Sequence, residues 1–296
     1  MEGSGFLLVG GDSLVGGGLF RALKRRGHNV LATTRRRDTL DAQRVFLDFE
    51  SEEPFRIPPG VDYAFIVAAA TNYERCETDP LAFRINVELT PRLIASLLEQ
   101  GVFVTFISTN SVFGGERPWP NEDDEQAPGI AYARQKSQAE RIVRAAADQL
   151  DASGRLNVVR LTKILDCRTS PLPAWFASWG RAEAVQPFSD LIFAPMSVSF
   201  VGEALATIGE ERIAGNLHLS GAENVSYVDF ASTLVQTLKM DPRLVSPTTA
   251  VEKGVNIAFK PRYSGLGMRR TTELTGVLPQ TLADVVTDLV AEKSSN

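Results

Sequence analysis

The stretch Phe6-Leu7-Leu8-Val9-Gly10-Gly11-Asp12-Ser13-Leu14-Val15-Gly16 links an apolar run to a glycine-rich turn and then to a helical pattern. Continuous apolar residues over 6–9 predict a buried strand, and the spacing that follows predicts a helix over 14–26. This order brings backbone N–H groups to the positive end of a helix, where phosphate binds. The stretch therefore predicts the first unit of a nucleotide-binding α/β fold, although an ordinary strand-to-helix turn would share the pattern.

Individual positions of this turn have separate expected roles at a dinucleotide pyrophosphate. Gly10 permits the tight turn, and Gly16 permits close packing of the helix. Ser13 occupies the middle position, where its hydroxyl can bond to phosphate but its Cβ narrows the approach. Leu14 and Val15 open the helix and bring their backbone N–H groups to the same place.

Short β-rich runs alternate with helical stretches through the first half of the chain. Besides 6–9, the expected strands are 30–33, 45–47, 63–68, 102–107 and 157–161. The expected helices are 14–26, 79–100 and 132–150. The apolar character of the runs indicates strands covered on both faces. The alternation therefore predicts an α/β fold with a Rossmann-type doubly wound parallel sheet.

The pattern loosens after about residue 162, where proline-rich connections separate two further expected helices, over 227–238 and 280–293. We expect residues 1–161 to form an NAD(P)-binding Rossmann domain. Residues 162–296 are expected to form a smaller C-terminal substrate-binding lobe. The boundary is soft, because segments of a second lobe often return to the first domain in such folds.

Composition argues against several classes of protein. The chain has 296 residues, of which 44% are apolar and 23% charged, as in ordinary soluble globular proteins. A formal net charge of -5 argues against a nucleic-acid surface, which needs a concentrated basic face. The run at 6–9 is too short for a membrane span, so we expect a cytoplasmic protein without membrane contact. The cysteines (Cys76, Cys167) and histidines (His28, His218) lack metal-ligand spacing, so no metal site is expected.

The residues after the second and third expected strands bear on the choice of cofactor. An acid after the second strand commonly holds the ribose hydroxyls of NAD, whereas an arginine accommodates the 2′-phosphate of NADP. This chain has no acid there but carries Arg35 and Arg36 within Thr33-Thr34-Arg35-Arg36-Arg37, so we expect NADP in preference to NAD. A solvated basic loop is the alternative. Asp48, after the third strand, is either an acceptor for the adenine amino group or a turn residue.

Tyr132 and Lys136 are spaced for proton-transfer chemistry. Residues four apart on a helix share a face, so the phenol and the ammonium can point into one pocket. A nearby cation is expected to lower a phenol pKa of about 10 toward working pH. The spacing alone is weak evidence, because it is common on ordinary amphipathic helices.

Several ordered segments together resemble the extended short-chain dehydrogenase/reductase superfamily, most closely its dTDP-4-dehydrorhamnose reductase (RmlD-like sugar-nucleotide-binding) branch. The resemblance covers nearly the whole chain. The matching segments are the glycine turn, 68–71 with Asp79-Pro80, Asn86-Val87, Ile107-Ser108-Thr109-Asn110-Ser111-Val112-Phe113, Tyr132 with Lys136, Phe193-Ala194-Pro195 and Leu217-His218-Leu219-Ser220-Gly221.

The resemblance implies roles for the reacting groups. Thr109 matches the hydroxyl residue that holds the substrate carbonyl, and Tyr132 matches the proton donor. Lys136 matches the residue that binds the nicotinamide ribose and assists the tyrosine. Hydride from a reduced nicotinamide and a proton from tyrosine would together convert a ketone to an alcohol.

Further positions are assigned by the same resemblance. The glycine turn matches the pyrophosphate-binding turn, and Ala68 and Ala69 match the strand end that lies along the cofactor. Thr71, which closes that segment, is grouped with the substrate-binding residues. Asn86 matches a residue often found beside the cofactor site, with a polar contact at a helix N-terminus as the alternative.

The sequence also departs from the pattern of the branch. Asn110 and Ser111 stand where an acid and an aromatic commonly follow the threonine, so an altered sugar pocket is expected. The acid pair of the related dehydratases is absent, which argues against dehydration. Lys163 replaces an aromatic and either faces the substrate or solvates a loop. Lys260 or Arg262 would bind the nucleotide diphosphate, or would lie in a solvated loop.

The leading hypothesis is an NADPH-dependent reductase of the keto group of a nucleotide-diphosphate sugar, with Tyr132 as proton donor. An epimerase that retains its nicotinamide is a second interpretation. A non-catalytic NADP-binding regulatory subunit is a third, because the branch also resembles the regulatory subunit of methionine adenosyltransferase. A homodimer stays open, since exposed helices of this fold often pair.

Overall fold

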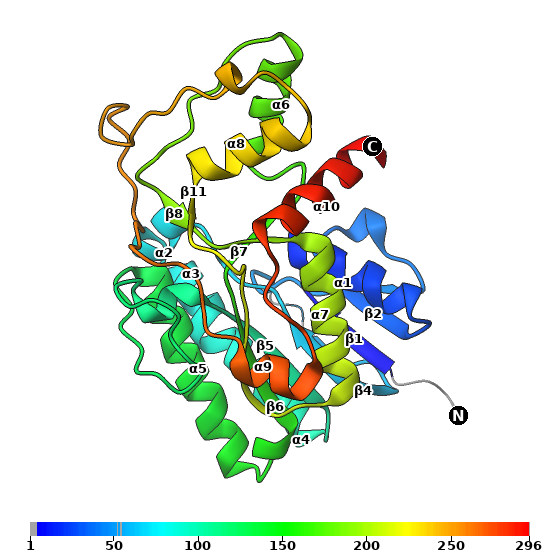
Figure 1. Ribbon diagram of the computed structural model, residues 1–296. Coiled ribbons are helices and arrows are strands. Elements are labelled where there is room, and N and C mark those ends of the chain that lie inside the picture. Colours follow the sequence, from blue (N-terminus) through cyan, green and yellow to red (C-terminus); the bar gives the residue numbers. More distant parts are fainter. Residues whose placement is uncertain (1–4, 52, 54, 296) are drawn as a thin grey trace.

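A seven-stranded parallel sheet forms the centre of the protein in the computed structural model, which describes residues 5–51, 53 and 55–295 (Figure 1). The strand order is β10-β6-β5-β4-β1-β2-β3. The strands are β1 Gly5–Val9, β2 Asn29–Thr34, β3 Arg44–Phe46, β4 Val61–Ile66, β5 Phe103–Thr109, β6 Leu156–Leu161 and β10 Gly215–Leu219. The predicted doubly wound α/β fold is therefore confirmed.

The order of the strands reverses between β1 and β4. From β1 the chain builds outward to β2 and β3, then crosses back to β4 and continues outward through β5 and β6 on the other side. In doubly wound sheets, a crevice opens at the carboxyl ends of the strands at such a reversal. This topology therefore places the candidate site next to the glycine turn that follows β1.

Alternate side chains of β1 enter two different cores. Phe6 and Leu8 pack on the face covered by α1 (Leu14–Arg25) and α7 (Val198–Glu211). Leu7 and Val9 pack on the opposite face, which is covered by α4 (Thr90–Glu99) and α5 (Ala131–Gln149). The continuous apolar runs of the sequence thus correspond to strands that are buried on both faces.

Glycines allow α1 and α7 to lie in close contact. A Cβ at Gly18 would come within 2.7 Å of Val198 Cγ2, and a Cβ at Gly202 would come within 2.7 Å of the Gly18 carbonyl oxygen. Neither position has room for a side chain, because the opposing atoms belong to the packed core or the backbone. Gly18 therefore serves helix packing and not the turn that precedes it.

The helix expected over 79–100 is divided into shorter pieces. The segment contains α3 (Pro80–Phe83), a π-helical stretch over Arg84–Leu89, and α4. A further short helix, α2 (Tyr73–Thr78), precedes it. π-helical turns often occur at functional sites, and this one carries Asn86.

The C-terminal half contributes both to the sheet and to a smaller group of elements. Strand β10 completes the central sheet, whereas α6, α8 and α10 lie together at one end of the molecule, away from α4 and α9 (Figure 1). Their shared core includes Trp175, Phe230 and Leu289.

The remaining elements are α6 Leu172–Gly180, α8 Tyr227–Thr237, α9 Arg269–Thr275, α10 Leu282–Ser295, β7 Lys163–Leu165, β8 Ile192–Phe193, β9 Pro195–Ser197, β11 Val225–Ser226, and 3-10 turns at Arg37–Thr39, Asn110–Phe113, Ser153–Arg155 and Pro242–Leu244. No helix in the described part of the chain is both long and apolar enough to cross a membrane.

Candidate active site

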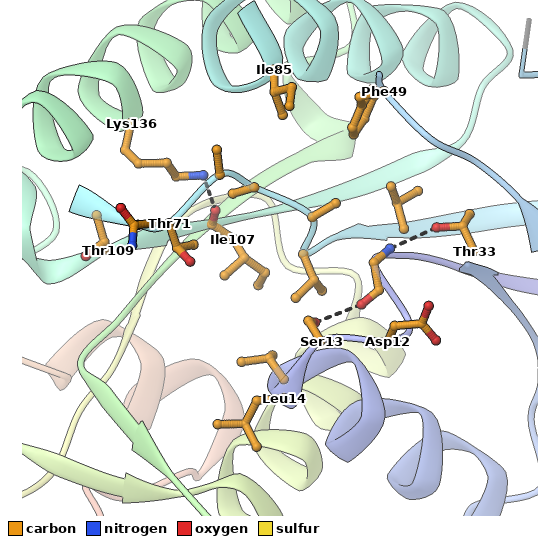
Figure 2. A pocket seen from close by; sticks show the side chains of 18 of the residues that line it. Asp12, Ser13, Leu14, Thr33, Phe49, Thr71, Ile85, Ile107, Thr109 and Lys136 are labelled. Carbon is orange, nitrogen blue, oxygen red and sulfur yellow. Dashed lines mark hydrogen bonds between the residues drawn. The ribbon is translucent and has the colours of Figure 1, made fainter. Parts of the chain in front are cut away.

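A cavity of about 640 Å³ opens at the carboxyl ends of the central strands (Figure 2). It runs from the glycine turn after β1 to the N-terminal turns of α5. The expected site residues that line it are Gly10, Ser13, Leu14, Val15, Arg35, Asp48, Ala68, Ala69, Thr71, Thr109, Tyr132 and Lys136. Residues from separate segments of the sequence thus share one crevice.

The glycine turn is sterically fixed at both ends. Gly10 has φ +99°, and a Cβ there would lie 2.7 Å from the backbone nitrogen of Ala68. A Cβ at Gly16 would lie 2.2 Å from the carbonyl oxygen of Gly10. Glycine is therefore required at both positions, because any side chain would push the turn away from β4 or away from α1.

Ser13 caps α1 with its side chain. Its Oγ accepts a hydrogen bond from the Gly16 N–H at 3.0 Å. It also donates one to the Gly10 carbonyl at 2.7 Å (Figure 2). The hydroxyl hydrogen is therefore already used within the turn. The N–H groups of Leu14 and Val15 belong to the first turn of α1 and have no intrahelical acceptor, so this end of the cavity suits an anion such as a pyrophosphate.

The opposite wall of this end comes from the segment after β3. Leu47, Asp48 and Phe49 line the cavity there. The Asp48 carboxylate also accepts a hydrogen bond from the Glu50 N–H at 3.0 Å, so it shapes a turn as well as facing the cavity. An apolar pair that flanks a carboxylate fits a flat heterocycle with an amino group.

The arginines after β2 occupy different positions. Arg35 is exposed and lines the cavity. Arg36 does not line it, because its guanidinium donates to the Asp12 carboxylate, with Nη2 2.9 Å from Oδ1. Only one of the two arginines predicted to bind the cofactor therefore faces the cavity.

Thr109, Tyr132 and Lys136 meet at the other end of the cavity. Thr109 is the last residue of β5, and Tyr132 and Lys136 lie in the first turns of α5. Figure 2 shows Thr109 and Lys136 on the same side of the cavity, close to Thr71. The sheet supplies the hydroxyl, and the helix supplies the phenol and the amine.

Lys136 lines the cavity but is almost completely buried. Its Nζ donates to the Ile107 carbonyl at 2.7 Å (Figure 2) and lies 3.8 Å from the centre of the Phe106 ring. Burial lowers the pKa of the Lys136 amine to about 7, and the charge of Glu140 opposes that lowering. The group is therefore poised to change charge near neutral pH.

The pKa of Tyr132 moves in the direction opposite to the expected one. Burial raises the pKa of its phenol, and the neighbouring Tyr73 and Cys76 raise it further, while a hydrogen bond with Thr109 lowers it. The rings of Tyr73 and Tyr132 have their centres 5.6 Å apart. The prediction of a lowered phenol pKa is wrong for this structure, because loss of solvent around the phenol dominates, whereas the Lys136 amine binds the Ile107 carbonyl. Tyr132 is protonated at neutral pH.

A buried polar network that sequence analysis missed supports this end of the cavity. Glu140, one turn after Lys136, accepts hydrogen bonds from Ser108 Oγ at 2.5 Å and from Arg160 Nη2 at 2.8 Å. Arg160 Nη1 also donates to His218 Nε2 at 3.2 Å, so the neutral His218 ring donates from Nδ1 to the Gly267 carbonyl at 2.9 Å. The signal in the sequence that could have revealed this network was an acidic residue, Glu140, four positions after Lys136 on the same helix.

Asn86 supports the cavity wall through hydrogen bonds to the backbone of a lining residue. Its side chain accepts from the Ala70 N–H and donates to the Ala70 carbonyl, both at 2.9 Å, and it donates to Gln135 at 2.9 Å. It does not line the cavity itself. Asn86 therefore fixes the segment after β4 that carries Ala68 and Ala69.

Five expected substrate residues, and Gly16, lie outside the cavity lining. The Asn110 side chain binds the loop at Ser264, and the Ser111 hydroxyl lies 3.0 Å from Thr109 Oγ1. Lys260 forms an ion pair with Asp190 at 2.7 Å, Arg262 lies over the Tyr263 ring, and Lys163 is exposed on β7. The structure thus brings most of the cofactor and catalytic candidates into the cavity, whereas most of the substrate candidates lie outside its lining.

Several cavity residues were not identified from the sequence. Asp12, Phe49, Thr162 and Ile164 line it, and so does Arg75 of α2. Thr162 follows directly after β6, and residues at the carboxyl ends of parallel strands are expected to face such a crevice. That rule would have identified Thr162, whereas the position of Arg75 depends on how α2 packs.

Comparisons with known proteins agree with this architecture. A family model described as the RmlD substrate binding domain matches residues 5–295. The spore coat polysaccharide biosynthesis protein SpsK of Bacillus subtilis (strain 168) is 24% identical over 293 residues, which cover 98% of either chain. The solved structure of MoeE5 in complex with UDP-glucose and NAD is 22% identical, with a TM-score of 0.80 and 99% of both chains covered. The dTDP-4-dehydrorhamnose reductase of Bacillus anthracis strain Ames in complex with NADP is 19% identical, with a TM-score of 0.79 and coverage of 98% of this chain and 99% of that chain.

Proposed function

Because the chain belongs to the RmlD substrate-binding-domain family, we propose that it is a nicotinamide-dependent reductase of the keto group of a nucleotide-diphosphate sugar. The observation that carries the proposal is the meeting of Thr109, Tyr132 and Lys136 at one end of a cavity whose other end is the glycine turn. A dinucleotide has its phosphates and its reactive ring at separate ends, and this cavity offers suitable groups at both.

The residues present suit such a cofactor. Free N–H groups at the start of α1 face the phosphate end, and Ala68 and Ala69 leave a smooth wall between the two ends. Lys136 would donate a hydrogen bond to the nicotinamide ribose. When bound, a reduced nicotinamide supplies the hydride that reduces the carbonyl carbon.

The protein side chains would handle the oxygen of the same carbonyl. The Thr109 hydroxyl donates a hydrogen bond to that oxygen as negative charge grows on it. Tyr132, which burial keeps protonated, transfers its phenolic proton to the oxygen and completes the alcohol. Solvent returns the proton, and the Lys136 ammonium stabilises the tyrosinate formed in between.

The proposal includes NADPH as the preferred reductant and a cytoplasmic location. The preference for NADPH rests on Arg35, the cation after β2 that lines the cavity. Proteins of this fold bind either cofactor, since MoeE5 was solved with NAD and the Bacillus anthracis reductase with NADP.

The test is turnover of a panel of nucleotide-linked keto sugars with NADPH or NADH, followed by loss of nicotinamide absorbance. Tyr132→Phe should lower turnover by about 10² to 10⁴-fold and leave dinucleotide binding unchanged. Tyr73→Phe is the matched control, because it removes the hydroxyl of the adjacent ring and should keep turnover within severalfold.

Other outcomes would replace the proposal. A dinucleotide that stays bound through purification, together with interconversion of sugar epimers, would identify the epimerase. A dinucleotide-binding protein without turnover, whose effect on a partner enzyme survives Tyr132→Phe, would identify a regulatory subunit.

A further inference from the structure

Asp12, in the middle of the glycine turn, binds residues at the end of β2, just after β2 and at the start of β3. Its Oδ2 accepts a hydrogen bond from Thr34 Oγ1 at 2.6 Å. Its Oδ1 accepts from Arg36 Nη2 at 2.9 Å and from Arg44 Nη1 at 3.1 Å. One carboxylate thus joins the turn to two guanidinium groups and a hydroxyl.

This arrangement is anchored in the fold. Thr34 is only 2% exposed, and its Oγ1 also accepts a hydrogen bond from the Arg36 N–H at 3.0 Å. The turn itself is attached to β2, because the Gly11 N–H donates to the Thr33 carbonyl at 3.1 Å. The Asp12 carboxylate therefore has a defined position at the end of β2.

Asp12 stands at the cavity and its arginine partners do not. Asp12, Thr34 and Arg35 line the cavity, whereas Arg36 and Arg44 are not among the described lining residues. Figure 2 shows Asp12 beside Ser13, at the end of the cavity that carries Thr33. The charged groups that face the cavity at the end of β2 are therefore Arg35 and the Asp12 carboxylate.

Asp12 lies at the end of β2, where NAD and NADP differ in the group that they present. In this fold, the ribose that carries either a 2′-hydroxyl or a 2′-phosphate binds beside the end of β2. A carboxylate offers about four acceptor positions, of which three are used here, so one remains for a ribose hydroxyl. A 2′-phosphate carries a charge of roughly -1.5 to -2 and would be repelled.

The tertiary structure thus supplies the acid that the sequence lacks after β2. The same carboxylate neutralises Arg36 and Arg44, which would otherwise attract a 2′-phosphate. We propose that Asp12 is a specificity-determining residue that weakens the preference for the 2′-phosphorylated dinucleotide provided by Arg35, so that the cavity also admits the unphosphorylated one. This inference rests on the proposed function only in assuming that the cavity binds a nicotinamide dinucleotide.

The test is calorimetric binding of NAD⁺ and NADP⁺ to the purified chain and to Asp12→Asn, without any sugar substrate. Asparagine keeps the shape and the acceptor for Thr34 but removes the charge, so NADP⁺ should bind about tenfold more tightly relative to NAD⁺. Asp12→Ser should shift the ratio in the same direction. In Asp12→Asn with Arg36→Ala, part of the gain should disappear, because the freed Arg36 guanidinium supplies part of it.

Asp38→Asn is the matched control. It removes one negative charge close to Arg36 from a residue that does not line the cavity, so the ratio of the two dissociation constants should stay within about twofold. An unchanged ratio in Asp12→Asn, or weaker NADP⁺ binding, would overturn the inference and leave the proposed function intact. Binding of neither dinucleotide to the unaltered chain would overturn both.

Discussion

Arg160 lies across the carboxylate of Glu140, with Nη2 2.8 Å from Oε2 and Nε 3.1 Å from Oε1. The two side chains are 3% and 0% exposed. Burial alone would raise the pKa of Glu140, but the hydrogen bond and charge of Arg160, with help from Arg144 and Ser108, lower it to about 2. This ion pair joins α5, which carries Tyr132 and Lys136, to the central sheet.

Loss of the Glu140 charge should destabilise the protein strongly. Glu140→Gln leaves the Arg160 charge buried without compensation, so the free energy of unfolding should fall by about 3 to 5 kcal/mol at pH 7. Urea unfolding measures the change. Glu183→Gln is the matched control, because Glu183 pairs with Arg181 at the surface and should cost less than about 1 kcal/mol.

The same ion pair predicts that the free energy of unfolding falls at acidic pH. The folded pKa of Glu140, about 2, lies below its usual value of 4.5, so its contribution is complete above pH 4.5 and is lost as pH falls toward 2. The stability difference between the unaltered protein and Glu140→Gln should therefore shrink over that window. A difference that stays constant from pH 6 to pH 3 would contradict the assigned charge state.

Burial of Lys136 predicts that the free energy of unfolding rises at alkaline pH. Its folded pKa of about 7 lies below its usual value of 10.5, so the unfolded chain binds one more proton between these values. Relative to Lys136→Met, the unaltered protein should gain up to about 1.4 kcal/mol of stability per pH unit as pH rises through that window. Unfolding of both proteins at pH 7 and pH 9 measures the gain, and equal changes in the two would refute it.

Alanine substitution at two adjacent glycines of α1 should change the stability of the protein in opposite directions. At Gly17 a Cβ would meet only Arg21 Nη1, at 3.6 Å, so Gly17→Ala should stabilise the helix by about 0.5 to 1 kcal/mol. At Gly18 it would meet Val198, so Gly18→Ala should destabilise the protein by about 1 to 3 kcal/mol. Thermal unfolding of both variants compares them directly, and changes of the same sign would show that α1 and α7 pack differently.

Thr109 should matter for catalysis much more than for cofactor binding. Thr109→Val removes the hydroxyl and should lower kcat by about 10² to 10³-fold, because a hydrogen bond to the growing oxyanion is lost. Thr109→Ser keeps the hydroxyl and should restore most of the activity. Dinucleotide affinity, measured by fluorescence, should stay within about twofold in both, since a larger loss would place Thr109 in the cofactor site.

Local patterns were sufficient to predict the main elements of the fold. The apolar run of β1 and the glycine turn gave the start of the sheet, and the alternation that follows gave its class. The division of the 79–100 helix into α3, the π-helical stretch at Arg84–Leu89 and α4 was missed. The place of β10 in the central sheet was equally hidden, since strand order depends on contacts between distant segments.

The sequence by itself determined the βαβ framework, the glycine turn and the shared helical face of Tyr132 and Lys136, because each depends on residues only a few positions apart. Tertiary structure decided that Asp12 lies beside Arg36 and Arg44, and that Asn86 supports Ala70. It also decided the direction of the Tyr132 pKa, since burial is set by every element that packs around the phenol. Spacing along the chain limits which groups can meet, but packing determines which of them do and how much water remains around them.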